Sequence, residues 1–167
     1  MAQNRKWPWL LGAVGIAAAA SYTGSWEGPS VLVAKHQYFD PPHVITYCHG
    51  ETSYDNPKVR VGDKFTPDFC DKDLQKKLHE YDVNMRKCLF ADMPEHRHIA
   101  ALDFFYNVGQ RNACGSTFVR ELNAGHVASA AENLSHWTKA NGKVLGGLVH
   151  RRTDDFKGEA AWVMRGD

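Results

Sequence analysis

The chain has 167 residues, a length that suits one domain with a single hydrophobic core better than two independent domains. Hydrophobic residues make up 43% of it and charged residues 23%, a composition that excludes disordered, collagen-like and multi-span membrane proteins. The formal net charge is only +1. A protein that binds nucleic acid phosphates needs a larger basic excess, so we expect no nucleic acid partner.

An uncharged stretch from Trp7 to Trp26 follows the basic pair Arg5 and Lys6. It is long enough to cross a bilayer as a helix, and the preceding positive charges predict a cytoplasmic N-terminus. Because the stretch is rich in Ala and Gly and ends in polar residues, its hold on a membrane should be weak. We therefore expect residues 1–26 to form an N-terminal transmembrane or signal segment, followed by a folded domain at residues 27–167.

Three roles are open for this segment. It fits a secretory signal that a peptidase removes, since small residues lie near Ala18 to Ser21. A permanent anchor would contain more Leu, Ile or Phe. A weak anchor that enters the membrane and then leaves it agrees with the Ala-rich composition. A buried helix of the folded core is the alternative that the basic flank and the terminal position disfavour.

The four cysteines, Cys48, Cys70, Cys88 and Cys114, agree with export to an oxidising compartment. They form no C-x-x-C pair and no zinc-ligand spacing, so we expect no metal. Four cysteines allow three disulfide pairings, and their positions alone do not choose among them. Buried free thiols are the other interpretation.

The first folded part should be a small sheet. Residues 31–52 are rich in β-branched and aromatic side chains, with a tight turn expected from Asp40 to His43 and a loop from Glu51 to Lys64.

The rest of the chain should be helical. Thr66, Pro67 and Asp68 form a helix start, and the apolar residues that follow recur at helical spacing along one face. Four further helices are expected, from Pro94 to Gly109, from Ser116 to Gly125, from His126 to Trp137 and from Leu148 to Trp162. The predicted class is α+β, with a small β-containing N-terminal lobe, a mainly helical C-terminal lobe and a cleft between them.

Two acids and a hydroxyl, Glu27, Asp40 and Thr46, lie where a helix end meets a turn and a strand. Glycoside hydrolysis needs one carboxylic acid to protonate the leaving oxygen and one carboxylate to act on a water or on the anomeric carbon. A threonine hydroxyl can hold that water. Spacing alone is weak support, because most of the 19 acids must be surface residues, and Asp40 before Pro41 also suits an ordinary turn.

Four ordered segments resemble the phage-type lysozymes, or endolysins. They are T-Y-C-H-G-E-T at 46–52, F-F-Y-N-V-G at 104–109, S-T-F-V-R-E-L-N-A-G at 116–125 and W-T-K-A-N-G-K-V-L-G-G-L-V-H-R-R at 137–152. The resemblance runs from about Glu27 to the end of the chain. The N-terminal stretch also resembles the signal-anchor-release segment of exported members. The resemblance implies a lysozyme-like fold.

The resemblance also implies site residues. Glu27 would be the general acid, Asp40 would orient or activate the attacking water, and Thr46 would hydrogen-bond that water. Thr52, Tyr106 and Asn107 would bind substrate. The family pattern is E-x8-D-x5-T, whereas this chain has E-x12-D-x5-T, which is a four-residue insertion. Glu51 also stands where the family usually has His.

The function implied is that of a lysozyme, a muramidase of the glycoside hydrolase class. It would cut the β-1,4 bond between N-acetylmuramic acid and N-acetylglucosamine in peptidoglycan, without a cofactor, and so lyse the host cell. We expect a monomer that crosses the bacterial inner membrane, is tethered there through residues 7–26 and is then released to the periplasm. After export we expect the disulfides Cys48–Cys70 and Cys88–Cys114. The alternatives are a non-catalytic peptidoglycan-binding protein and a lytic transglycosylase.

Overall fold

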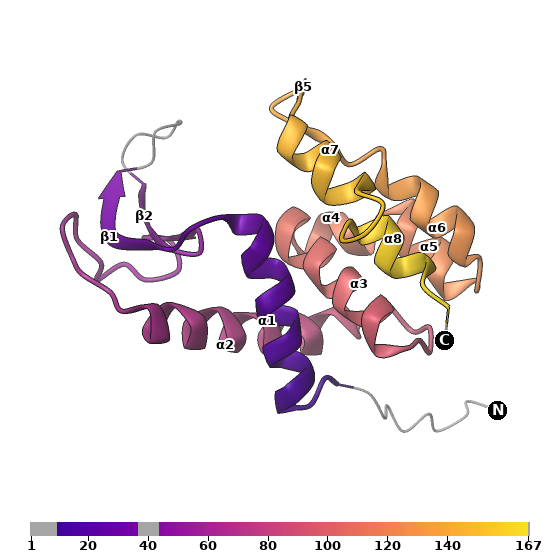
Figure 1. The fold of residues 1–167 in the computed structure, drawn as a ribbon, viewed down its shortest axis with the longest axis horizontal. Coiled ribbons are helices and arrows are strands. Elements are labelled where there is room, and N and C mark those ends of the chain that lie inside the picture. Colours follow the sequence, from indigo (N-terminus) through magenta and orange to yellow (C-terminus); the bar gives the residue numbers. More distant parts are fainter. Residues whose placement is uncertain (1–9, 37–43, 167) are drawn as a thin grey trace. The chain divides into compact units, whose positions relative to one another are not determined.

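The computed structural model describes residues 10–36 and 44–166, and its elements run from an N-terminal helix through a small sheet to a series of helices (Figure 1). By its internal contacts the chain divides into two compact units, one made of residues 20–77 and the other of residues 1–19 and 78–167. The expected turn from Asp40 to His43, and with it Asp40 itself, lies outside the described residues.

Helix α1, Ala13–Glu27, includes most of the uncharged N-terminal stretch. Ile16 and Ala19 on this helix are buried in the structure. The segment is thus a helix with buried side chains here, which is the alternative that the sequence disfavours. Within the described part of the chain, no helix has the length and apolar character needed to cross a membrane. The division into residues 1–26 and 27–167 stays a prediction.

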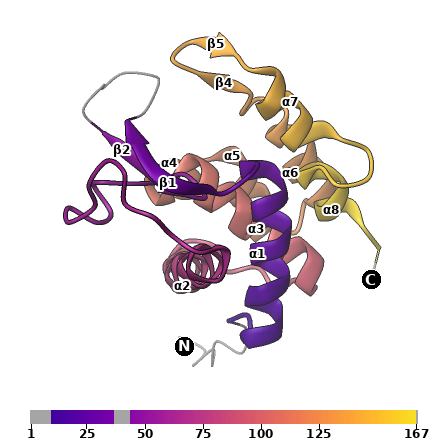
Figure 2. The same ribbon diagram turned by 60° about the vertical axis from the view of Figure 1, so that its left-hand side comes forward.

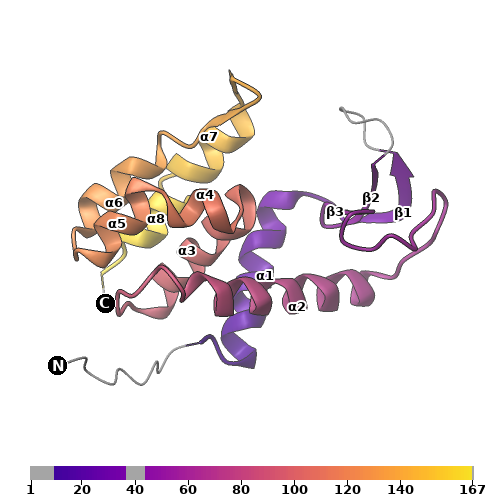
Figure 3. The ribbon, with the colours of Figure 1, turned by 180° about the vertical axis from the view of Figure 1, so that it is seen from behind.

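The sheet of residues 20–77 has three antiparallel strands in the order β1-β2-β3: Val31–His36, Ile45–Cys48 and Glu51–Thr52 (Figure 3). The third strand was predicted as the beginning of a loop. It forms because the chain reverses tightly after Cys48, so that Tyr47 pairs with Glu51 and Thr46 with Thr52. Behind the sheet, Tyr47 stacks on Phe65 with ring centroids 4.8 Å apart.

Helix α2, Pro67–Met85, begins where the sequence predicts. Oγ1 of Thr66 accepts a hydrogen bond from the amide of Phe69, which satisfies one of the unpaired donors at the helix start. The apolar face is buried at Leu74, Leu78 and Met85, so the helical spacing of these residues identified the buried side correctly.

The unit that contains residues 78–167 is built around α3, Glu95–Val108, whose residues from His98 to Phe105 are all buried. Gly109 ends this helix with a φ of 81°, as the sequence predicts. The ring of Phe104 contacts those of Phe118 and Trp137 edge to face, with centroids 4.9 and 5.3 Å away. These rings form the centre of the helical core.

The other helices of this unit are α4, Gln110–Cys114; α5, Thr117–Asn123; α6, Val127–Leu134; α7, Gly146–Thr153; and α8, Glu159–Met164. A hairpin of β4, Lys139–Ala140, and β5, Lys143–Val144, precedes α7 (Figure 2). One prediction was wrong here: the single last helix expected from Leu148 to Trp162 is two helices, α7 and α8. The break occurs because Oδ1 of Asp154 accepts hydrogen bonds from the amides of Phe156 and Lys157.

The structure contains two disulfides, Cys48–Cys70 and Cys88–Cys114, the same pairing as the one expected from the sequence. Each lies within one compact unit. The first joins the end of β2 to α2, and the second joins the chain just after α2 to the end of α4.

Candidate active site

Glu27 is the last residue of α1, and Gly28 follows it with a φ of +78°, a conformation that favours glycine and ends the helix. The Glu27 side chain is half-buried. Its Oε2 lies 3.9 Å from the position that a Cβ on Gly50 would occupy. The carboxylate therefore lies against the turn between β2 and β3.

That turn is narrow and needs special backbone conformations. Cys48 has a φ of 49° and Gly50 a φ of 95°. The amide of Gly50 donates to the carbonyl of Tyr47 at 3.2 Å, which closes the turn. A side chain at Gly50 would meet an unfavourable backbone conformation, so glycine fits this position.

Thr46 and Thr52 face each other as direct partners across β2 and β3. Both are half-buried. The amide and the hydroxyl of Thr52 donate to Oδ2 of Asp55 at 2.7 and 3.0 Å, so this candidate substrate-binding residue is fixed by its own loop. The unit of residues 20–77 thus contains Glu27, Thr46 and Thr52 on neighbouring elements.

The surroundings of this turn are acidic. Burial raises the pKa of the Tyr47 hydroxyl to about 12, with further contributions from Asp73, Glu51 and Asp55. Burial also raises the pKa of the Glu51 carboxyl, although Lys77 acts in the opposite direction. Nζ of Lys77 lies 3.9 Å from Glu51 and 3.3 Å from Asp55, so one ammonium group is shared by two carboxylates.

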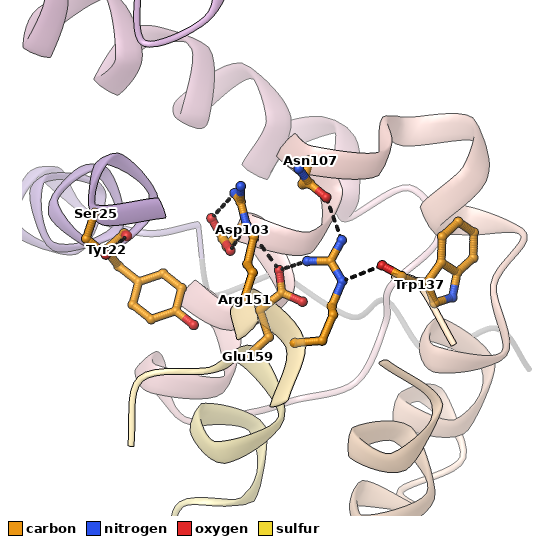
Figure 4. Close-up of polar contacts among 8 residues, drawn as sticks. Tyr22, Ser25, Asp103, Asn107, Trp137, Arg151 and Glu159 are labelled. Atoms are coloured by element: carbon orange, nitrogen blue, oxygen red, sulfur yellow. Dashed lines mark hydrogen bonds and ion pairs between the residues drawn. The ribbon is translucent and has the colours of Figure 1, made fainter. Parts of the chain in front are cut away.

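Tyr106 and Asn107, the other candidate substrate-binding residues, lie on α3 in the other unit. The Tyr106 ring packs edge to face on Tyr81, with centroids 5.6 Å apart. Oδ1 of Asn107 accepts a short hydrogen bond from Nη2 of Arg152 (Figure 4). The Asn107 side chain is therefore held in one orientation by a buried guanidinium.

Arg151 and Arg152 form buried ion pairs, and Figure 4 labels Arg151 with its partner Asp103. Arg151 binds both carboxylate oxygens of Asp103, at 3.0 and 2.7 Å. Arg152 donates to Glu159 and to the backbone carbonyl of Trp137, and its guanidinium lies 5.3 Å from the centre of the Phe104 ring. Two guanidinium groups and two carboxylates balance in charge, which makes the burial of all four tolerable. The Arg pair therefore forms structural ion pairs within this unit.

Sequence reasoning missed the contacts that hold Glu51, His49 and Arg152 in place. Each partner lies a different number of positions away, and many other acidic and basic side chains lie nearby in the sequence. No spacing rule therefore selects the partners Lys77, Asp71 and Glu159. The replacement of the family's usual His by Glu51 was the one visible signal. No group of three or more His, Cys, Asp or Glu side chains suited to a metal ion occurs in the described ranges.

The comparisons with known proteins agree on one family. The sequence profile of the phage lysozyme family matches residues 25–155. The SAR-endolysin of Enterobacteria phage PA-2 is 33% identical over 141 residues, which cover 84% of this chain and 84% of the relative. The SAR-endolysin of Bacteriophage PS119 is 32% identical over 142 residues, which cover 84% and 83%.

Solved structures show the same fold. The muramidase domain of SpmX from Asticaccaulis excentricus matches with a TM-score of 0.75 at 23% identity, over 89% of this chain and 96% of that one. The endolysin from Escherichia coli O157:H7 phage FAHEc1 matches with a TM-score of 0.73 at 22% identity, over 93% and 94%. The chain belongs to the phage lysozyme family and to its SAR-endolysin subtype.

Proposed function

We propose that this endolysin is a muramidase that hydrolyses the β-1,4 bond between N-acetylmuramic acid and N-acetylglucosamine in bacterial peptidoglycan. The observation that carries the proposal is the position of the Glu27 carboxylate, at the end of α1 and against the β2–β3 turn. A half-buried acid at the end of a rigid helix suits the protonation of a glycosidic oxygen. Family membership supports the substrate class.

In this proposal Glu27 is the general acid. Asp40 orients or activates the attacking water, and Thr46, on β2, donates or accepts a hydrogen bond to that water. Thr52, Tyr106 and Asn107 bind the glycan. The geometry of Thr52 and Asn107 favours this role, because each side chain is held by a carboxylate or guanidinium and needs no ordering when substrate binds. No cofactor takes part.

The residue assignment is tested by measuring the release of soluble muropeptides from purified peptidoglycan by the parent, Glu27→Gln and Glu80→Gln. Glu80 is an exposed acid on α2 and serves as the matched control. We expect Glu27→Gln to lose at least about a hundredfold in rate, because glutamine cannot protonate the leaving oxygen, while Glu80→Gln keeps the parent rate. A folded Glu27→Gln variant with the parent rate would overturn the assignment.

Export is the second part of the proposal. We propose that residues 7–26 hold the chain in the inner membrane, that release delivers a monomer to the periplasm, and that the tethered form is inactive. The burial of Ile16 and Ala19 on α1 supports this, because side chains packed inside the folded chain cannot contact lipid at the same time. Comparing muramidase activity in the membrane and soluble fractions of host cells tests it. Equal specific activity in the two fractions would contradict it.

A further inference from the structure

His49 occupies the β2–β3 turn, and only 9% of it is exposed. Its Nε2 lies 3.3 Å from Oγ of Ser30 and 3.2 Å from Oδ1 of Asp71 on α2. Its Cε1 lies 3.8 Å from the position that a Cβ on Gly24 would occupy. One imidazole ring thus lies beside the last turn of α1 and within hydrogen-bond distance of the segment before β1 and of the first half of α2.

Two of the residues beside the ring flank Glu27 in the chain. Gly24 precedes Glu27 by three positions, about one helical turn, and Ser30 follows it by three. The ring therefore lies beside the chain before the candidate acid and within hydrogen-bond distance of the Ser30 side chain after it. A shift of the ring would move the end of α1 or the segment that follows it, and the Glu27 side chain with either.

The polar atoms of the ring fit this bracing role. Nδ1 is buried and has no hydrogen-bond partner among the described residues. A buried unprotonated nitrogen is less costly to leave unpaired than a buried N–H group, so we assign the ring hydrogen to Nε2. That N–H then lies between the Asp71 carboxylate and the Ser30 hydroxyl, and both can accept it.

The backbone of the same turn is fixed separately. The amide of His49 donates to Oε2 of Glu51 at 2.6 Å, and Glu51 is buried with Lys77 beside it. The preceding residue, Cys48, is joined to α2 by a disulfide. Gly50, which follows, is the residue whose Cβ position lies 3.9 Å from the Glu27 carboxylate. The turn is thus held on both sides of His49 while it faces Glu27.

We propose that His49 is a positioning residue for Glu27, and that Glu51 supports it by fixing the backbone of the turn. The His49 ring sets where the end of α1 and its carboxylate lie relative to the β2–β3 turn. It acts through Gly24, Ser30 and the turn backbone and does not act on the substrate itself. This inference rests on the proposed muramidase function.

The test compares kcat and KM of the parent, His49→Phe, His49→Gln and the control His79→Phe on soluble glycan strands. Phenylalanine keeps the ring volume and loses the Nε2 hydrogen bonds, whereas the glutamine amide places an N–H donor close to the position of Nε2. His79 is an exposed residue on α2. Thermal unfolding of each variant shows whether it is folded at the assay temperature.

We expect His49→Phe to lower kcat by about 10- to 100-fold, the effect of a small displacement of a catalytic group, with KM changed less than about twofold. His49→Gln should recover most of kcat, and His79→Phe should equal the parent. A role in stability alone would leave kcat of the folded fraction unchanged. A folded His49→Phe variant with the parent kcat would therefore overturn the inference.

If His49→Phe does not fold, Ser30→Ala and Asp71→Asn test the positioning role instead, because each removes or weakens one partner of Nε2. Each should lower kcat by about two- to fivefold, the equivalent of one hydrogen bond, and parent values of kcat in both would overturn the inference. Failure of the proposed function looks different. In that case the folded parent itself releases no product, whereas an active parent with an indifferent His49 contradicts the positioning role alone.

Discussion

The carboxylate of Asp82 accepts a hydrogen bond of 2.7 Å from the backbone amide of Leu11, 71 positions earlier in the chain. Its other oxygen lies 2.6 Å from Nε2 of His98, and Nδ1 of His98 lies 2.9 Å from Nη2 of Arg86. Since a guanidinium only donates, Nδ1 of His98 accepts and Nε2 donates to Asp82. The buried carboxylate thus receives two hydrogen bonds and fixes the chain just before α1.

Asp82→Asn should therefore destabilise the folded chain. Asparagine has one acceptor oxygen, so either the Leu11 amide or the His98 N–H would face an NH₂ group. We expect a loss of about 2 kcal/mol in the free energy of unfolding, the usual cost of leaving a buried donor unpaired. Urea unfolding measures it, with the exposed Asp155→Asn as control. Equal unfolding free energies for Asp82→Asn and the parent would contradict the role of this contact.

Glu51 and Asp55 predict opposite pH dependences of stability. Burial raises the pKa of Glu51 above 4.5, so the folded chain holds this proton more tightly than the unfolded chain. The free energy of unfolding must then fall as pH rises from about 4.5 through the folded pKa. Glutamine does not titrate. The stability of the parent relative to Glu51→Gln should therefore decrease over this range, as urea unfolding at a series of pH values would show.

For Asp55 the sign is reversed. Burial alone would raise its pKa, but hydrogen bonds from Thr52 and the charge of Lys77 outweigh burial and hold the pKa below 3.8. The stabilisation is present above about pH 3.8 and is lost as pH falls through the folded pKa. The parent should thus lose stability relative to Asp55→Asn in acid. If the stability of the parent relative to Glu51→Gln and relative to Asp55→Asn changed in the same direction with pH, the opposite pKa shifts of Glu51 and Asp55 would be contradicted.

The two disulfides should differ in their effect on activity. They close sequence separations of 22 and 26 residues, so removing either by paired Cys→Ser changes should lower the free energy of unfolding by about 3 kcal/mol. Only Cys48–Cys70 holds the turn that faces Glu27. We expect the variant without it to lose kcat as well, while the variant without Cys88–Cys114 keeps the parent kcat when folded. Equal kcat for both would contradict the link between the turn and the site.

The sequence predicted those elements whose signals are local. Helix α3 begins after Pro94 and ends at Gly109, and α5 is capped by Ser116, whose Oγ accepts from the amide of Val119. In each case the terminal residue itself marks the helix boundary, because its backbone conformation suits a helix end or because its side chain accepts a hydrogen bond from an amide in the first turn of the helix.

Two kinds of feature were not predicted: a local turn within a continuous apolar pattern, and contacts between residues far apart in the chain. The Asp154 turn that separates α7 from α8 also needs Gly158 to pack against Asp154, where a Cβ would approach the backbone to 2.5 Å. The apolar spacing of this region resembles one continuous helix. In the candidate site, the residue types of Glu27 and Thr46 were visible, but the support from His49, Glu51 and Lys77 required the folded chain.

The most direct measurement is the chemistry of the product. Purified peptidoglycan is digested with the parent and with Glu27→Gln, and the soluble fragments are identified by mass spectrometry with detection of reducing ends. We expect muropeptides with reducing N-acetylmuramic acid ends from the parent and none from Glu27→Gln. Anhydro-sugar products would contradict hydrolysis and indicate a lytic transglycosylase, and glycan binding by a folded parent without any product would indicate a binding protein.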